Sequence, residues 1–216
     1  MVGKVGAGIT GVSVLVFAGA MLVELVTGVS TASISYVASI FIAIGYVLFA
    51  SGVVSLGSDS KVPAAGFAGL TFAAIYAVLI LIVYFAMLTT VRLNTQLSNE
   101  ALSLISYEHL GSLFFNYNLL GYGFMSLSTF FVGFTVAPRD KGDRVFRALL
   151  RIHGVFFFSC LIMPMTGAFT ADTSPAIGMA ILLVWCAFFM PVCVLGWRYL
   201  SHDPAGFPPH QDTSPR

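Results

Sequence analysis

The sequence predicts an all-α fold: a polytopic membrane protein, built as a bundle of six transmembrane helices with a short interfacial helix in the third loop. Three observations lead to this prediction. Hydrophobic residues make up 58% of the 216 residues. Charged residues make up 9%, far below the roughly 25% that is typical of soluble domains. Long apolar runs follow one another almost from end to end, and lipid accepts such runs as helices because each helix satisfies its own backbone hydrogen bonds.

The longest apolar run, residues 64–90, is the span around which the others are arranged in this prediction. A helix of this length extends for roughly 40 Å at about 1.5 Å per residue, and a bilayer core is roughly 30 Å thick. Small residues recur at every fourth position on one face, at Ala65, Gly69, Ala73 and Ala77. Such a stripe lets a second helix approach closely inside a membrane. We therefore interpret this span as the packing core of the bundle.

Five further spans are predicted, at residues 5–27, 34–56, 113–136, 148–170 and 175–199. The first apolar run exceeds the usual length of a signal-peptide core, so we expect a retained helix. Ser98 is suited to cap a short helix that lies on the membrane surface before the fourth span. We expect Pro164 and Pro191 to kink the last two spans. The spans form one domain, residues 1–200, and residues 201–216 form a polar cytoplasmic tail.

The distribution of positive charge predicts the orientation. With six spans, one side of the membrane holds nine of the ten lysines and arginines, and the other side holds Arg92 alone. Positive charge accumulates on the cytoplasmic side, so we expect an integral plasma (inner) membrane protein with both termini in the cytoplasm. Arg144, Arg147 and Arg151 are spaced i, i+3 and i+7 and predict a site for anionic lipid headgroups. A net charge of +1 excludes the basic field that nucleic-acid binding needs.

A candidate ligand-binding site is predicted near the outer end of the bundle. Ionisable residues inside a membrane are costly and tend to be functional, and Glu24 is the one charged residue of the first span. Polar residues of the third loop and the fourth span are expected on the same side. The candidates are Glu24, Asn116, Asn118, Tyr122, Glu108 and His109.

Structural readings of the same residues stand beside this one. Glu24 would instead be neutral or bond to an asparagine of the fourth span. The polar residues of that span would bond between helices, at about 0.6 kcal/mol per contact. The loop acids, including Glu100 and Asp172, would simply be solvated. If the loops brought the acids together, they would form a site for a hard cation or a proton.

The remaining chemistry-bearing residues indicate no cofactor and no metal. A haem held by His153 would need a second histidine within the spans, and the other three histidines lie outside them. A histidine that is hydrogen-bonded near the inner interface is the favoured reading. Cys160, Cys186 and Cys193 lack metal-ligand spacing and are expected to be small buried hydrophobes. No nucleophile motif, phosphate loop or dinucleotide fingerprint appears.

Three stretches carry a resemblance to a known group of proteins: VELV around Glu24, EHLGSLFFNYNLLGYG leading into the fourth span, and the inner loop VAPRDKGDRVFRALLRIHG. In these, and in the layout of most of residues 5–200, the chain resembles uncharacterised six-helix bacterial integral membrane proteins of unknown function. The resemblance implies a bacterial inner membrane and brings no activity with it.

Three functional hypotheses follow. The first is a non-catalytic accessory or assembly subunit of a membrane complex, with other membrane protein subunits and lipids as its partners. The second is a carrier or receptor for a small or apolar ligand that enters from the outer side near Glu24, which requires a cavity reaching that residue. The third is an intramembrane enzyme, which requires at least two of Glu24, Glu108, His109 and Asn116 within hydrogen-bond reach.

Overall fold

The computed structural model describes residues 1–57, 63–169 and 175–201. Within these ranges every regular element is a helix and there is no strand, so the predicted all-α class is confirmed. The elements are α1 (Val2–Thr27), α2 (Ala32–Leu56), α3 (Pro63–Ala86), the π-helical turn η1 (Met87–Val91), α4 (Asn99–Ile105), α5 (Leu113–Thr135), α6 (Lys141–His153), α7 (Phe156–Met165) and α8 (Pro175–Ser201). The turn before α3, the turn with Asp172 and the tail after Ser201 fall outside the described residues.

Within the described ranges, five helical segments are long and apolar enough to cross a membrane: Val2–Thr27, Ala32–Leu56, Pro63–Val91, Lys141–Met165 and Ile177–Ser201. The protein is therefore a multi-pass membrane protein by length and composition. The predicted fourth span coincides with α5, which has 23 residues and no charge. Its asparagines, serines and threonines lower its hydropathy, and most of them face inward: Asn118, Ser126, Ser128 and Thr129 are buried.

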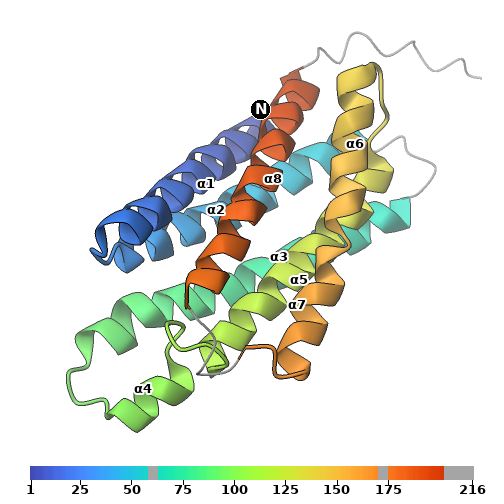
Figure 1. Cartoon of the computed structure of the whole chain (residues 1–216). Helices are drawn as coiled ribbons and strands as arrows, with labels where there is room; N and C mark the ends of the chain where they lie inside the picture. The colour runs from blue at the N-terminus through green and yellow to red at the C-terminus, as the bar shows by residue number, and fades with distance from the viewer. Residues whose placement is uncertain (58–62, 170–174, 202–216) are drawn as a thin grey trace, which may run out of the picture.

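The helices form two packed groups (Figure 1). In one group, α1 packs against α2 and α8. In the other, α5 lies between α3 on one side and α6 and α7 on the other, and α2 joins the groups through α3. The stripe of Ala65, Gly69, Ala73 and Ala77 is buried along α3, and the Gly69 carbonyl accepts a 2.7 Å hydrogen bond from Ser128 of α5. The α3 span therefore packs through the face that the sequence indicates.

Glycines bring the backbones of α1 and α2 together. A Cβ atom placed on Gly6 would lie 2.4 Å from the backbone nitrogen of Phe49, and one on Gly52 would lie 2.4 Å from the Cα atom of Gly3. Real Cβ atoms do not tolerate such distances to backbone. Small residues at these positions therefore set the separation of the two helices, as is common where lipid supplies no hydrophobic drive for association.

The predicted fifth span is divided into two helices, and the division falls between His153 and Phe156. The kink expected at Pro164, inside the second of these helices, stays a prediction. Asp140 caps α6 by accepting a 2.9 Å hydrogen bond from the Asp143 backbone N–H, so the helix begins at Lys141. It stops at His153, where Gly154 packs so closely on α5 that a Cβ atom there would lie 2.8 Å from the Phe130 Cβ. After this break, α7 runs through Pro164 and ends one residue later.

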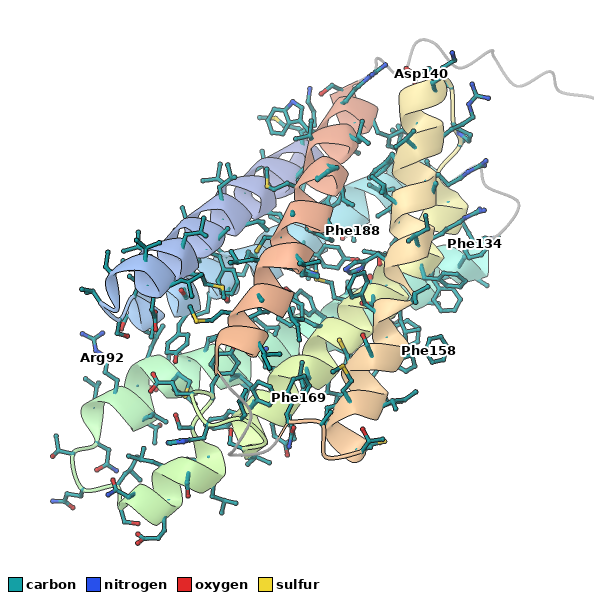
Figure 2. All side chains as sticks on the ribbon, viewed as in Figure 1. Arg92, Phe134, Asp140, Phe158, Phe169 and Phe188 are labelled. Atoms are coloured by element: carbon teal, nitrogen blue, oxygen red, sulfur yellow. The ribbon has the colours of Figure 1, made fainter. Side chains whose placement is uncertain are left out.

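One end of the molecule is tied together by ion pairs. Arg139 binds Asp143 at 3.0 Å, and Arg198 at the end of α8 binds Asp140. Hydrogen bonds from the Asp143 and Gly142 backbone N–H groups and the charge of Arg198 lower the pKa of Asp140. The N-terminus, the start of α6 and the end of α8 gather here, whereas Arg92 lies at the opposite end of the bundle (Figures 1 and 2).

The glycine contacts give a first prediction. Replacing Gly6 with alanine should force α1 and α2 apart and lower the melting temperature in detergent, because overpacking of a tight interface costs about 1–3 kcal/mol. Gly19 of the same helix is the matched control, since a Cβ atom there has nothing within 4 Å. Gly19→Ala should leave the melting temperature unchanged or slightly raised. Equal losses for the two variants would contradict the close approach.

Candidate functional site

Glu24 lies in the last turn of α1 and holds the turn into α2. Gly28 ends α1 with a left-handed backbone (φ 69°), and its N–H donates to the Glu24 carbonyl at 2.9 Å. The chain then folds back, so that the Thr31 backbone N–H donates to Glu24 Oε2 at 2.9 Å. The Thr31 hydroxyl lies 3.1 Å from the same oxygen. The partner of the carboxylate is therefore Thr31. The alternative in which Glu24 bonds to an asparagine of the fourth span is wrong.

Glu108 is brought to the same end of the bundle by the loop between α4 and α5. Ser112 fixes this loop: its hydroxyl donates to the Ser106 carbonyl at 2.6 Å and accepts the Phe115 N–H as the cap of α5. Glu108 Oε1 accepts a 3.0 Å hydrogen bond from the Tyr36 hydroxyl of α2. A residue of the third loop is thereby joined to a span 72 positions away in the sequence.

A cavity of about 310 Å³ opens between these two carboxylates. Its walls come from α1, α2, α3, α5, α8 and the loop after α4, and Phe169 also lines it. Figure 2 shows Phe169 and Arg92 toward the same end of the molecule, away from Asp140. The lining is mostly apolar and aromatic, as in ligand pockets generally. Of the predicted site residues, Glu24, Glu108 and Asn118 line it.

Two buried polar atoms at the cavity lack a partner. Asn118 and Tyr84 both line the cavity and are 2% and 1% exposed. Within the described part of the chain, neither Asn118 Oδ1 nor the Tyr84 hydroxyl has a partner at hydrogen-bond distance, although the side chains of Ser39 and Tyr107 lie near the Tyr84 hydroxyl. An unsatisfied buried polar group costs about 1–3 kcal/mol. These atoms are available to a molecule that occupies the cavity.

Three tyrosines form an aromatic cluster at the cavity. The ring centroids of Tyr36 and Tyr84 lie 5.3 Å apart, those of Tyr36 and Tyr107 5.9 Å apart, and those of Tyr84 and Tyr107 5.5 Å apart. All three rings line the cavity. Burial raises the pKa of Tyr107, so its hydroxyl is neutral at physiological pH. The cluster presents ring faces and edges beside the Glu108 carboxylate.

A second cavity of about 410 Å³ adjoins the first and is more polar. The two share Ser30, Ala32, Tyr36 and Glu108, so the bonded Tyr36–Glu108 pair stands between them. His109 and Arg92 line this second cavity, together with Met87 and Val91 of η1. The π-helical turn therefore borders the site, which is where such turns often occur.

The other predicted candidates lie elsewhere. The Asn116 side chain donates to the Gly111 carbonyl at 3.0 Å. Tyr122 is buried with its ring centroid 5.0 Å from that of Trp185, and it lines neither cavity. Glu100 is exposed on α4, where hydrogen bonds from its own backbone N–H and from Ser98 lower its pKa. Asp172 falls outside the described residues, so the acidic group as a whole stays a prediction.

The aromatic walls of the cavity were not predicted. Tyr36 and Tyr84 are visible in the sequence as tyrosines near those ends of two spans that are predicted to face outward. This is also the pattern of residues that anchor a helix at the membrane interface. Their convergence on one cavity depends on the packing of separate helices. The one sequence signal that points to it is the presence of these tyrosines at the same end as Glu24.

His153 is a structural residue that joins three helices. Its Nε2 accepts a 3.1 Å hydrogen bond from the Trp185 indole of α8, so the proton lies on Nδ1. Nδ1 lies 2.8 Å from Thr129 Oγ1 of α5 and donates to it, and Thr129 donates to the Ser126 carbonyl at 2.8 Å. Every donor in this hydrogen-bonded network has an acceptor. This satisfied network supports the structural reading of His153.

The three arginines predicted to bind headgroups lie along α6 or at its end. Arg144 is exposed, and Arg147 and Arg151 are half-buried. The Arg151 guanidinium lies over the Phe134 ring, 4.2 Å from its centroid. Headgroup binding stays a prediction.

The His153 network gives a second prediction. Replacing Trp185 with phenylalanine should leave His153 Nε2 buried without a donor, and thermal unfolding in detergent should show a loss of about 1–3 kcal/mol. Trp197, which is 45% exposed, provides the matched control. Equal destabilisation by Trp185→Phe and Trp197→Phe would show that only ring volume matters.

Comparison with protein-family models, with curated proteins and with solved structures finds no match to this chain. The resemblance to six-helix bacterial membrane proteins therefore rests on the layout of spans and loops. Any functional conclusion must come from the geometry of the molecule itself.

Proposed function

We propose that this chain is a carrier or receptor that binds a small, largely apolar ligand in the cavity between Glu24 and Glu108. The observation that supports this most strongly is the cavity itself, because its walls hold two buried polar atoms without partners. The ligand-binding hypothesis requires a cavity that reaches Glu24, and Glu24 lines this cavity. A bundle whose side chains left no such space would have argued against ligand binding.

The size and chemistry of the cavity suit such a ligand. Its volume of about 310 Å³ lies at the lower end of the range of roughly 300–1,000 Å³ for small-molecule sites. Apolar and aromatic side chains would cover the body of the ligand. Asn118 Oδ1 and the Tyr84 hydroxyl would gain the hydrogen bonds that they lack within the described protein.

The proposal includes a membrane arrangement. We propose that α5 is the sixth span, that both termini lie in the cytoplasm of a bacterial cell, and that α4 lies on the outer surface of the inner membrane. Support comes from the inward-facing polar residues of α5 and from the basic segments gathered at the end opposite Arg92. The ligand would then enter from the outer side.

The other two hypotheses receive less support. The accessory or assembly role stays a prediction, because nothing in the described residues favours it over ligand binding. For an enzyme, no hydrogen bond in the described chain joins any two of Glu24, Glu108, His109 and Asn116: Glu24 binds Thr31, Glu108 binds Tyr36 and Asn116 binds Gly111.

Filling the cavity tests the proposal. Gly178 lines the cavity, and a Cβ atom there meets only Leu110 Cδ2, at 3.9 Å. Gly178→Leu should therefore occupy the cavity without disturbing the backbone. Gly19→Leu places the same side chain on an open surface and is the control.

The measurement is the thermal shift of purified protein with a panel of small amphiphiles. A compound at about 100 times its Kd should raise the melting temperature by roughly 5–10 °C. Gly178→Leu should abolish this shift, and Gly19→Leu should retain it. A shift that persists in Gly178→Leu, or a panel without any binder, would contradict the proposal.

A further inference from the structure

We infer that the ligand of this cavity is an organic cation. Such a ligand combines an apolar body with an ammonium group that carries N–H donors. The inference rests on the proposed ligand-binding function and names its ligand class. Two carboxylates, Glu24 and Glu108, line the cavity, and none of the lysines, arginines or histidines of the described chain lines it. The cavity wall therefore carries negative charge that the wall itself does not neutralise.

Neither carboxylate has a cationic partner among the described residues. The salt bridges among the described residues join Arg139 to Asp143 and Arg198 to Asp140, at the other end of the molecule. Arg92 and His109 line the adjoining cavity, which shares Glu108, yet neither forms an ion pair with Glu108 within the described structure. A bound cation would supply the missing charge.

Each carboxylate also keeps one oxygen available. The protein engages Glu24 through Oε2 and Glu108 through Oε1, and no hydrogen bond from a described residue reaches Glu24 Oε1 or Glu108 Oε2. The unpaired Oδ1 of Asn118 is a third acceptor at the cavity. A ligand that meets these atoms needs donors. An anion would meet acceptors and like charge.

Aromatic rings complete the recognition of a cation. Tyr36, Tyr84 and Tyr107 line the cavity with ring centroids within 6 Å of one another. Electron-rich ring faces attract ammonium groups, and clusters of such rings are a common site for them. The hydrogen bond between Tyr36 and Glu108 places a carboxylate directly on this cluster.

The rest of the wall distinguishes an organic cation from a metal ion. The described residues contain no group of three or more His, Cys, Asp or Glu side chains that is placed to hold a metal. Apolar side chains make up much of the rest of the wall: Phe17, Met21, Leu110, Phe115, Leu119 and Leu182. Such a wall binds the apolar body of an organic cation, whereas a hard metal ion needs oxygen ligands on most sides.

Charged thiol reagents test the inference without a known ligand. Leu119 lines the cavity and is replaced by cysteine in the full-length protein after Cys160, Cys186 and Cys193 are changed to alanine. The probes are the cationic methanethiosulfonate-ethylammonium and the anionic methanethiosulfonate-ethylsulfonate. Gln96→Cys on the exposed loop before α4 provides the reference, and the ratio of the two rates cancels differences in thiol ionisation.

The cation should react with Leu119→Cys roughly tenfold or more faster than the anion, relative to Gln96→Cys, because a cavity of one charge sign concentrates the opposite ion. Adding Glu24→Gln and Glu108→Gln should return the ratio to the reference. Glu108→Gln alone should lower the rate ratio partially. Because Glu108 lies in an exposed loop, this variant keeps the test valid even if Glu24→Gln loosens the turn between α1 and α2.

The outcomes separate the two claims. Equal rates at Leu119→Cys, or a faster anion, would overturn the inference of a cation and leave an open cavity for the proposed function. A cation preference that survives both glutamine substitutions would likewise overturn it. If neither reagent reached Leu119→Cys while both modified Gln96→Cys, the cavity would be closed, and both the inference and the proposed function would fail.

Discussion

Lipid offers no hydrogen bonds, so each polar group inside this bundle must find its partner within the chain. Several buried hydroxyls do so locally: Thr10 donates to the Gly6 carbonyl and Ser39 to the Ser35 carbonyl of the preceding turn. Others join helices, as Tyr46 of α2 and Ser128 of α5 do at 2.8 Å. The hydrogen-bonded network around His153 joins three helices, α5, α6 and α8, and each of its donors has an acceptor.

Against this background the unpaired groups are informative. Five buried side-chain atoms of the described residues have no partner, on Tyr76, Tyr84, Asn118, Tyr122 and Arg151. The tyrosine rings of residues 76 and 122 pack on each other in the core, with their centroids 5.7 Å apart, and the guanidinium of Arg151 lies over Phe134. The remaining two line the same cavity as both carboxylates. Two of the five polar atoms that the described residues leave unsatisfied thus lie where a ligand has room to meet them.

Much of the fold could be predicted because its causes are local. Apolar runs define the helices, the four-residue stripe of small residues identifies the buried face of α3, and Ser98 caps α4 by accepting the Ala101 N–H. The break at Gly154 could not be predicted, because it depends on Asp140 starting α6 early and on Phe130 of another helix packing against the glycine. Pro164 lies inside α7 and gives no signal for this break.

The candidate site was predicted in part for a similar reason. Glu24 stands out because a charge in a span is costly, and the polar character of α5 indicates Asn118. What the sequence does not contain is the distance between elements. The Tyr36–Glu108 hydrogen bond joins a span to a loop 72 residues later, and the tyrosine cluster combines α2, α3 and the loop after α4. Contacts of this kind leave no periodic pattern in the chain.

The central claim is that the space between Glu24, Tyr84 and Asn118 holds a molecule that is not protein. A high-resolution density map of the protein, extracted gently from its native membrane into lipid nanodiscs, tests this claim most directly. We expect elongated non-protein density there, within hydrogen-bond distance of Asn118 Oδ1 or the Tyr84 hydroxyl. Side chains that fill the space and bond to those two atoms, or water alone, would contradict the account.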